Sequence, residues 1–348
     1  MYEGIQLLNK NFLLVAVADP NYEKRQLAVE KWGVPRAYSE SEEMLENENL
    51  DLIIIATPPS THFALALEAA KKGIHILVQK PLTRTLKEAK QIIQSCEKNT
   101  VGLKVSFSRR YTPAFVAARD LVNSLGQSFL FRVTWCSPSG IKPRTEKVWK
   151  EELNTLGGIL VDYGTHIVDI AHWWMGEIKD GHLNLSIIKG ELDNISSFIL
   201  QHTSGGNTLC SLSNMEYNKR EVYEYIAASG GFTLERKSDG YPGEWALQSW
   251  EVAKLQSEIK YFKTPDVNPF LVEINDFICT LKQGEIPIDP GNLGYSALQA
   301  TTLLYRSASH VKDCDLDEFS LKDFFRDQRK SEGLKQVRAD DSVTRLIV

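Results

Sequence analysis

The feature that most constrains the fold is an alternation of buried-strand and helix patterns over the first third of the chain. Four runs are apolar and rich in β-branched residues, and they span residues 12–20, 50–59, 74–81 and 101–110. The segments between them have helical periodicity, and they span residues 22–33, 61–73 and 86–99. This rhythm predicts a parallel sheet covered by helices, so we expect an α/β domain over residues 1–105.

Beyond about residue 125 the sequence changes to short strand patterns separated by turns rich in Gly, Asn and Ser. These strand patterns lie at residues 128–137, 183–190, 195–214 and 222–236. Helical patterns accompany them at residues 157–176, 268–284 and 296–310. Alternating strands are typical of an antiparallel sheet with one packed face and one open face. We therefore expect an α+β domain with a large, mostly antiparallel sheet over residues 106–330, a homo-oligomer formed through its open face, and a charged tail over 331–348.

Charge and composition exclude several classes of function. The chain has 348 residues and a net charge of −5, and no basic cluster carries the interleaved aromatic residues of a nucleic-acid site. The longest apolar runs are strand-sized and no apolar leader opens the sequence, so we expect no membrane partner and a cytoplasmic protein. The 5 cysteines form no C-x-x-C pair, which argues against disulfides and a zinc knuckle.

Ligands of parallel α/β sheets bind beyond the carboxyl ends of the strands, which makes the residues after each apolar run candidates. These candidates for cofactor binding are Asp19, Thr57, Pro58, His62, Gln79 and Lys80. A carboxylate such as Asp19 can accept hydrogen bonds from an adenosine ribose and repel a 2′-phosphate, which favours NAD over NADP. A local turn before Pro20 explains Asp19 equally well. Lys80, pinned by Pro81, fits either a place at the cleft or a structural role.

The segment VDYGTH sets Asp162 and His166 four places apart inside the apolar run 157–176. At helical spacing both residues fall on one stripe with Asp169 and Trp173. Three interpretations fit this pattern. The pair could belong to a metal site, it could act as an acid/base or proton-relay pair, or the segment could be a core helix whose polar groups are satisfied by neighbours.

Several segments match motifs of a known family. They are VAVADP at 15–20, IIIATPPSTHFALALEAAKKGIHILVQKPL at 53–82, SRRYTPA at 108–114, GGILVDYGTHIVDIAHWWMG at 157–176 and the helical close around 270–310. On these residues the chain resembles the Gfo/Idh/MocA oxidoreductases, which include glucose–fructose oxidoreductase and inositol dehydrogenases. The resemblance covers nearly the whole chain. It implies an NAD(P)-dependent oxidoreductase that transfers a hydride between nicotinamide and a hydroxyl carbon of a sugar, polyol or related compound.

The resemblance also implies roles for individual residues. In this family the lysine of an E-K-P element lies near the nicotinamide, and a D-x-x-x-H pair contacts the substrate; these roles map onto Lys80, Asp162 and His166. His166 would exchange the proton of the substrate hydroxyl, Asp162 would orient and polarise the site, and Lys80 would stabilise developing alkoxide charge. We expect the rim of the substrate site to include Arg109, Arg110 and Tyr163.

Two features depart from the family's pattern. Gln79 stands where the family has a glutamate, so Lys80 lacks an adjacent carboxylate that could hold its ammonium group. No G-x-G-x-x-G occurs in the sequence, and Met1 falls inside or just after the region where the first strand and this turn are expected. We therefore expect an N-terminally truncated Rossmann-like sheet, with residues 1–11 forming the latter half of its first helix. Without the amides of that turn, NAD binding should be weak.

Two other functions stay open on the sequence alone. The first is a non-enzymatic relative that keeps the fold but has impaired cofactor binding. The second is metal-dependent hydrolase or isomerase chemistry using Asp162, His166 and Asp169. No fourth ligand lies at a recognisable spacing, so we predict no metal site.

Overall fold

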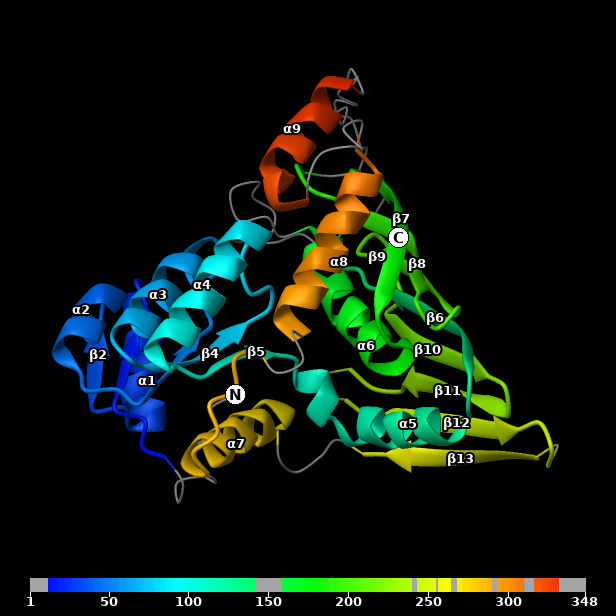
Figure 1. Cartoon of the computed structure of the whole chain (residues 1–348), viewed down its shortest axis with the longest axis horizontal. Coiled ribbons are helices and arrows are strands. Elements are labelled where there is room, and N and C mark those ends of the chain that lie inside the picture. Colours follow the sequence, from blue (N-terminus) through cyan, green and yellow to red (C-terminus); the bar gives the residue numbers. More distant parts are fainter. Residues whose placement is uncertain are drawn as a thin grey trace, which may run out of the picture.

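The computed structural model describes residues 12–141, 158–188, 190–239, 243–254, 256–263, 268–289, 293–309 and 316–331. Two predicted segments, the helix within 1–11 and the tail beyond Ser331, lie outside these residues. The described chain forms an α/β domain and an α+β domain, with helix α8 lying between them (Figure 1).

The first domain contains parallel strands covered by helices. Its strands are β1 (Ala16–Ala18), β2 (Arg36–Tyr38), β3 (Leu52–Ile55), β4 (His75–Gln79) and β5 (Leu103–Ser106). Its helices are α1 (Tyr22–Trp32), α2 (Ser41–Asn47), α3 (Pro59–Lys71) and α4 (Leu86–Asn99). β1 pairs with β2, and β3, β4 and β5 form a separate sheet, with every pair parallel. The predicted parallel sheet is confirmed as two hydrogen-bonded parts within the described residues.

Local signals explain where these helices begin and end. α1 ends at Gly33, whose φ of 64° is a left-handed conformation that favours glycine. α4 begins after Thr85, whose side chain accepts a hydrogen bond from the backbone N–H of Glu88. The sequence patterns did not predict β2 and α2, because elements of 3 and 7 residues are too short to show a clear period.

The second domain is built on one large sheet. Its strands are β6 (Ser128–Cys136), β7 (Ile178–Ser186), β8 (Ile195–His202), β9 (Asn207–Ser213), β10 (Arg220–Ala227), β11 (Gly230–Arg236), β12 (Trp245–Glu251) and β13 (Gln256–Phe262). They lie in the order β13-β12-β11-β10-β6-β9-β8-β7. β6 and β9 run parallel, whereas the other neighbouring pairs are antiparallel. The predicted mostly antiparallel sheet is confirmed.

Helices pack on one face of this sheet. They are α5 (Pro113–Ser124), α6 (Thr165–Met175) and α8 (Leu293–Ser307), and Figure 1 shows them on the same side of the strands. α9 (Leu321–Ser331) packs against α8, after a short 3₁₀ turn (Leu316–Glu318). Under α5 and α6 lies an aromatic core in which Trp174 contacts Phe131 and Phe232 edge to face.

Helix α7 (Pro269–Lys282) follows the large sheet in sequence but packs against the first domain. Leu271, Ile274 and Phe277 form a buried cluster with Leu77 of β4. The following residues continue this contact, because the N–H of Leu103 in β5 donates to the carbonyl oxygen of Pro287 at 2.8 Å. At the carboxyl end of β5, the hydroxyl of Ser106 donates to the Glu273 side chain of α7 at 2.6 Å.

None of the helices in the described segments is both long enough and apolar enough to cross a membrane.

Candidate active site

The contact between Lys80 and Asp162 joins the two domains. Lys80 follows the last residue of β4, and its Nζ donates to the backbone carbonyl oxygen of Asp162. The same Nζ lies 3.3 Å from Oδ1 of the Asp162 carboxylate. The Lys80 side chain is 11% exposed and that of Asp162 is 27% exposed. An ammonium group and a carboxylate thus meet at the carboxyl end of the parallel sheet, where ligands of this fold bind.

Asp162 lies in a π-helical turn (Leu160–Gly164) that leads directly into α6. Such turns shift the register of the residues before them and occur frequently at functional sites. Asp162 faces Lys80, whereas the Asp169 carboxylate is buried and accepts from Arg110 Nη2 at 2.8 Å.

A buried carboxylate fixes the start of the π-helical turn. Asp193 accepts hydrogen bonds from the N–H of Leu160 and the hydroxyl of Tyr305, both at 2.9 Å. A Cβ at Gly158 would lie only 1.9 Å from Asp193 Oδ1, so the close approach requires glycine. Asp193 therefore positions the turn that carries Asp162.

His62 links the segment after β3 to the residue that follows Lys80. Its Nδ1 lies 2.9 Å from the carbonyl oxygen of Pro81, and its Nε2 lies 2.9 Å from that of Thr57. Burial lowers the pKa of His62, so the ring is neutral near pH 7 and donates to one of these carbonyls at a time. His62 and Thr57 thus hold in place the chain that follows Lys80. Pro58 caps the first turn of α3.

His166 lies in the first turn of α6, four residues beyond Asp162. Its ring centroid is 6.3 Å from that of Tyr163, in an edge-on arrangement. Tyr163 in turn stacks on Trp135 of β6, with centroids 3.5 Å apart. The imidazole therefore lies beside the stacked pair of Tyr163 and Trp135. His166 and Asp162 belong to the same helical segment. Contact of His166 and Tyr163 with substrate stays a prediction.

The two arginines expected at the rim have their charges engaged by buried acids. Arg109 forms an ion pair with Glu221 and is 9% exposed, and its guanidinium carbon lies 5.9 Å from the Tyr163 ring centroid. Arg110 donates from Nε and Nη2 to the Asp169 carboxylate. Both arginines therefore hold the walls of the site, and direct contact with substrate stays a prediction for them.

Asp19 follows β1 at the carboxyl end of the first sheet. One carboxylate oxygen accepts from the N–H of Asn21 at 2.8 Å, and the other lies 4.0 Å from Lys24 Nζ. The side chain is 32% exposed and can accept further hydrogen bonds. The local turn and a ribose contact are thus compatible.

Four buried acids with clear structural roles were missing from the sequence prediction. They are Asp193, Glu221, Glu273 and Asp289. Glu273 had a detectable signal, because it falls on the apolar stripe of α7 that includes Phe277. An acid on such a stripe indicates a buried, hydrogen-bonded carboxyl group. Among the residues placed in the structure, no group of three or more His, Cys, Asp or Glu side chains could hold a metal ion.

Comparison with known families gives a consistent result over both domains. Residues 3–107 match the oxidoreductase family with an NAD-binding Rossmann fold, and residues 115–232 match the GFO/IDH/MocA C-terminal domain. The chain belongs to the GFO/IDH/MocA oxidoreductase family. The predicted family is therefore confirmed.

Two relatives illustrate the similarity. Myo-inositol 2-dehydrogenase of Thermotoga maritima is 25% identical over 328 residues, which cover 91% of this chain and 94% of the relative. The NAD⁺-dependent scyllo-inositol 2-dehydrogenase of Bacillus subtilis is 32% identical over 296 residues, covering 79% of this chain and 80% of the relative. Among solved structures, levoglucosan dehydrogenase in complex with NADH has a TM-score of 0.76 at 19% identity, covering 88% of this chain and 92% of that one. That similarity shows the shared GFO/IDH/MocA fold.

The residues in place fit the two ends of a dinucleotide. Asp19 would accept hydrogen bonds from the adenosine ribose at the end of β1. Thr57, Pro58, Gln79 and Lys80 would surround the nicotinamide end, because they follow β3 and close β4.

Proposed function

We propose that the protein is an NAD-dependent dehydrogenase that oxidises a hydroxyl carbon of a sugar, polyol or related compound, or reduces the corresponding carbonyl. The observation that carries this proposal is the contact of Lys80 with Asp162 at the carboxyl end of the sheet. The family is an NAD-binding one, and its relatives include two inositol dehydrogenases.

The chemistry divides among three side chains. NAD, when bound, supplies the acceptor for the hydride. His166 would take the proton of the substrate hydroxyl as a general base. The Lys80 ammonium would stabilise negative charge on the substrate oxygen, and Asp162 would hold that ammonium in place through the 3.3 Å contact.

A substrate screen tests this function. NADH formation should appear with one or more members of a panel of inositols, pentoses, hexoses and anhydrosugars, and calorimetry should show NAD binding. Turnover should depend on Lys80, so Lys80→Met should bind NAD but lose activity. A protein that binds neither NAD nor NADP and oxidises no member of the panel would support the non-enzymatic alternative.

Asp19 should set the preference for NAD. Replacing Asp19 by serine should raise the ratio of NADP to NAD affinity by roughly tenfold or more, because a like-charge contact near the surface costs about 1–4 kcal/mol. Titration calorimetry with both dinucleotides measures this ratio. Asp51→Ser is a matched control, since Asp51 precedes β3 at the opposite end of the sheet. An equal ratio in both variants would remove Asp19 from the cofactor site.

We propose that the open face of the large sheet forms a homo-oligomer. This face carries Leu130, Ile199, Leu209, Ile226 and Ile259. Ile199, Ile226 and Ile259 are exposed, and Ile226 pairs directly with Leu130 across β10 and β6. Clustered exposed apolar side chains of this kind mark interaction surfaces.

The double substitution Ile199→Glu/Ile226→Glu should convert the oligomer to a monomer, because burying two unpaired carboxylates in an interface is strongly unfavourable. Light scattering at micromolar concentration measures the mass. Val116→Glu is the control, since Val116 is an exposed apolar residue on α5, away from the open face. A monomeric unmodified protein at that concentration would contradict the assembly.

We also propose a cytoplasmic location, which the cysteines support. Cys96, Cys136 and Cys210 are buried as free thiols, and Cys279 is partly buried and also free. Burial raises the pKa of Cys96 to about 12 and that of Cys136 to about 11, so both thiols stay protonated and unreactive. Free thiols are typical of a reducing compartment.

A further inference from the structure

A line of hydrogen bonds runs from α7 to the residue beside Lys80. The Glu273 carboxyl group is 1% exposed, and its Oε2 accepts from the hydroxyl of Ser106 at 2.6 Å. Its Oε1 accepts from the backbone N–H of Phe107 at 2.8 Å. The Ser106 oxygen in turn accepts from Gln79 Nε2 at 3.2 Å. Glu273, Ser106 and Gln79 therefore connect α7, β5 and β4 one residue before Lys80.

The backbone of Lys80 is held on both sides. Before it, the Gln79 side chain is fixed by Ser106. After it, the carbonyl oxygen of Pro81 lies 2.9 Å from His62 Nδ1. The place from which the Lys80 side chain reaches Asp162 is thus set by these two contacts. The first leads to the carboxyl group of Glu273 on α7, and the second leads to the imidazole of His62 on α3.

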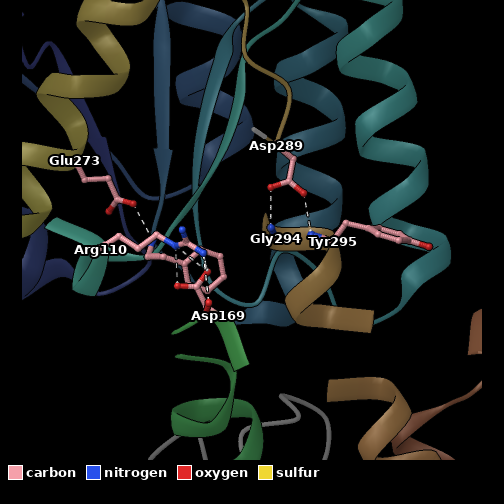
Figure 2. A network of polar contacts seen from close by, with 7 residues as sticks. Arg110, Asp169, Glu273, Asp289, Gly294 and Tyr295 are labelled. Atoms are coloured by element: carbon pink, nitrogen blue, oxygen red, sulfur yellow. Dashed lines mark hydrogen bonds and ion pairs between the residues drawn. The ribbon is translucent and has the colours of Figure 1, made fainter. Parts of the chain in front are cut away.

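The surroundings of Glu273 allow its charge to change near neutral pH. Burial raises the pKa of Glu273 to about 7, against the opposing effect of its two hydrogen bonds. Lys104 on β5 favours the carboxylate, whereas Asp169 on α6 opposes it. Figure 2 shows Glu273 reaching from α7 toward Arg110, which pairs with Asp169. The remaining titratable neighbours, which both bind Lys104, are Tyr111 and Asp276.

We propose that Glu273 is a positioning residue for Lys80, which acts through Ser106 and Gln79 and supplies from α7 the carboxylate that position 79 lacks. This inference rests on the proposed function for its link to turnover, but the placement of Lys80 can be measured without turnover.

The direction of each hydrogen bond explains how protonation acts. As a carboxylate, Glu273 accepts from both Phe107 and Ser106, which leaves the Ser106 oxygen free to accept from Gln79. Once protonated, the carboxyl group becomes a donor and competes for the Ser106 oxygen. The Ser106 hydroxyl then no longer donates to that carboxyl oxygen, and its own oxygen is shared between the carboxyl O–H and the Gln79 amide, so the contact with Gln79 weakens. The end of β4 should therefore loosen as the pH falls below about 7.

An exchange of side chains tests this line. Glu273→Gln removes the charge and should lower kcat by about tenfold, the usual range for a group that orients a catalytic residue. The KM for NAD should stay unchanged, and the step in kcat near pH 7 should disappear. The double variant Gln79→Glu/Glu273→Gln should recover most of the lost kcat, because the new amide at position 273 can donate to Ser106 and Ser106 can donate to the new carboxylate at position 79.

The single variant Gln79→Glu sharpens the prediction. It places two carboxyl groups on one Ser106 hydroxyl, which has a single proton to donate. One of the two must stay protonated, so the kcat step should move to higher pH. Asp276→Asn is the control on the same helix, because Asp276 is a surface partner of Lys104 and lies outside the line. Its kcat step should stay near that of the wild type.

Chemical labelling separates this inference from the proposed function. Acetylation of Lys80 by acetic anhydride, followed by peptide mass spectrometry, should be severalfold faster in Glu273→Gln than in the wild type and should return toward the wild-type rate in the double variant. Equal rates in all three proteins would overturn the inference, whether or not the enzyme turns over. Altered labelling with no turnover in the wild type would instead refute the proposed function alone.

The buried carboxyl group also has a signature in stability. A carboxyl group whose pKa is raised from 4.5 to about 7 in the folded state binds its proton more tightly when folded. The stability from that proton is complete below pH 4.5 and is lost as the pH rises through about 7. As the pH is raised from 4.5 to about 7, the unfolding temperature of the wild type should fall more than that of Glu273→Gln, and calorimetry measures both. Parallel curves would show that Glu273 does not titrate in this range.

Discussion

Replacing His166 by alanine should lower turnover by on the order of 10²–10⁴-fold, the loss expected for a positioned general acid/base group. The imidazole lies four residues beyond Asp162, whose carboxylate meets Lys80 at 3.3 Å. Removing the ring deletes the proton acceptor but keeps the ammonium group that stabilises the substrate oxygen. The effect should therefore fall on kcat, and the KM for NAD should change little. Steady-state kinetics with the substrate found by screening measures both.

His172→Ala is the matched control, because His172 lies on the same helix near its end. Burial lowers the pKa of His172, so the ring is neutral near pH 7 in the fold. Its loss should leave turnover close to wild type. If both variants lost activity equally, the damage would come from α6 and not from proton transfer, and His166 would lose its assigned role.

The sequence predicts the parts of the site that depend on local order. The alternation of strands and helices places Lys80 at a carboxyl strand end, and the apolar run around Asp162 predicts a helix in the second domain. Since ligands collect at that edge of the sheet, the meeting of these two residues follows from local patterns together with the fold rule. The end of α1 at Gly33 is predictable in the same way, because glycine readily adopts the left-handed conformation that closes a helix.

Other features depend on contacts between distant segments. The π-helical turn (Leu160–Gly164), which carries Asp162, has no pattern that can be recognised in a single sequence. The arginines of SRRY were expected at the rim of the substrate site, and their contact with substrate stays a prediction. Their charges are matched by Asp169, which is 59 residues from Arg110, and by Glu221 on β10 of the large sheet, which pairs with Arg109. Pairings of this length cannot be read from periodicity.

The ion cluster around Glu221 supports the wall of the site. Glu221 is 3% exposed and pairs with Arg109, and its other oxygen lies 2.9 Å from Arg236 Nη1. The hydroxyl of Tyr223 donates to it at 2.6 Å. Arg109 in turn lies over the rings of Phe115 and Tyr223 at 5.4 and 5.8 Å. One carboxylate therefore pairs with two guanidinium groups beside the aromatic core.

Replacing Glu221 by alanine should lower the free energy of unfolding by about 3–5 kcal/mol, because the substitution leaves the Arg109 guanidinium buried without its counter-charge. The unfolding temperature should fall by roughly 6–20 °C. Burial alone would raise the pKa of Glu221, but Arg109, Tyr223 and Arg236 hold it below the ordinary 4.5. The stability from this carboxylate is therefore complete above pH 4.5 and is lost as the pH falls below that value.

Glu224→Ala provides the comparison on the same strand, since Glu224 is 37% exposed and pairs with Arg132 at the surface. That change should cost only about 0–1 kcal/mol. The double substitution Arg109→Met/Glu221→Leu should recover part of the loss, because it removes the buried Arg109 charge together with its counter-charge, while Arg236, which is 20% exposed, keeps its hydrogen bond to the carbonyl oxygen of Ser238. Thermal and urea unfolding of the four proteins above and below pH 4.5 measures these differences. Equal losses for Glu221→Ala and Glu224→Ala would mean that the buried carboxylate does not stabilise the fold through its charge, and Arg109 would then be held against Tyr163 by packing alone.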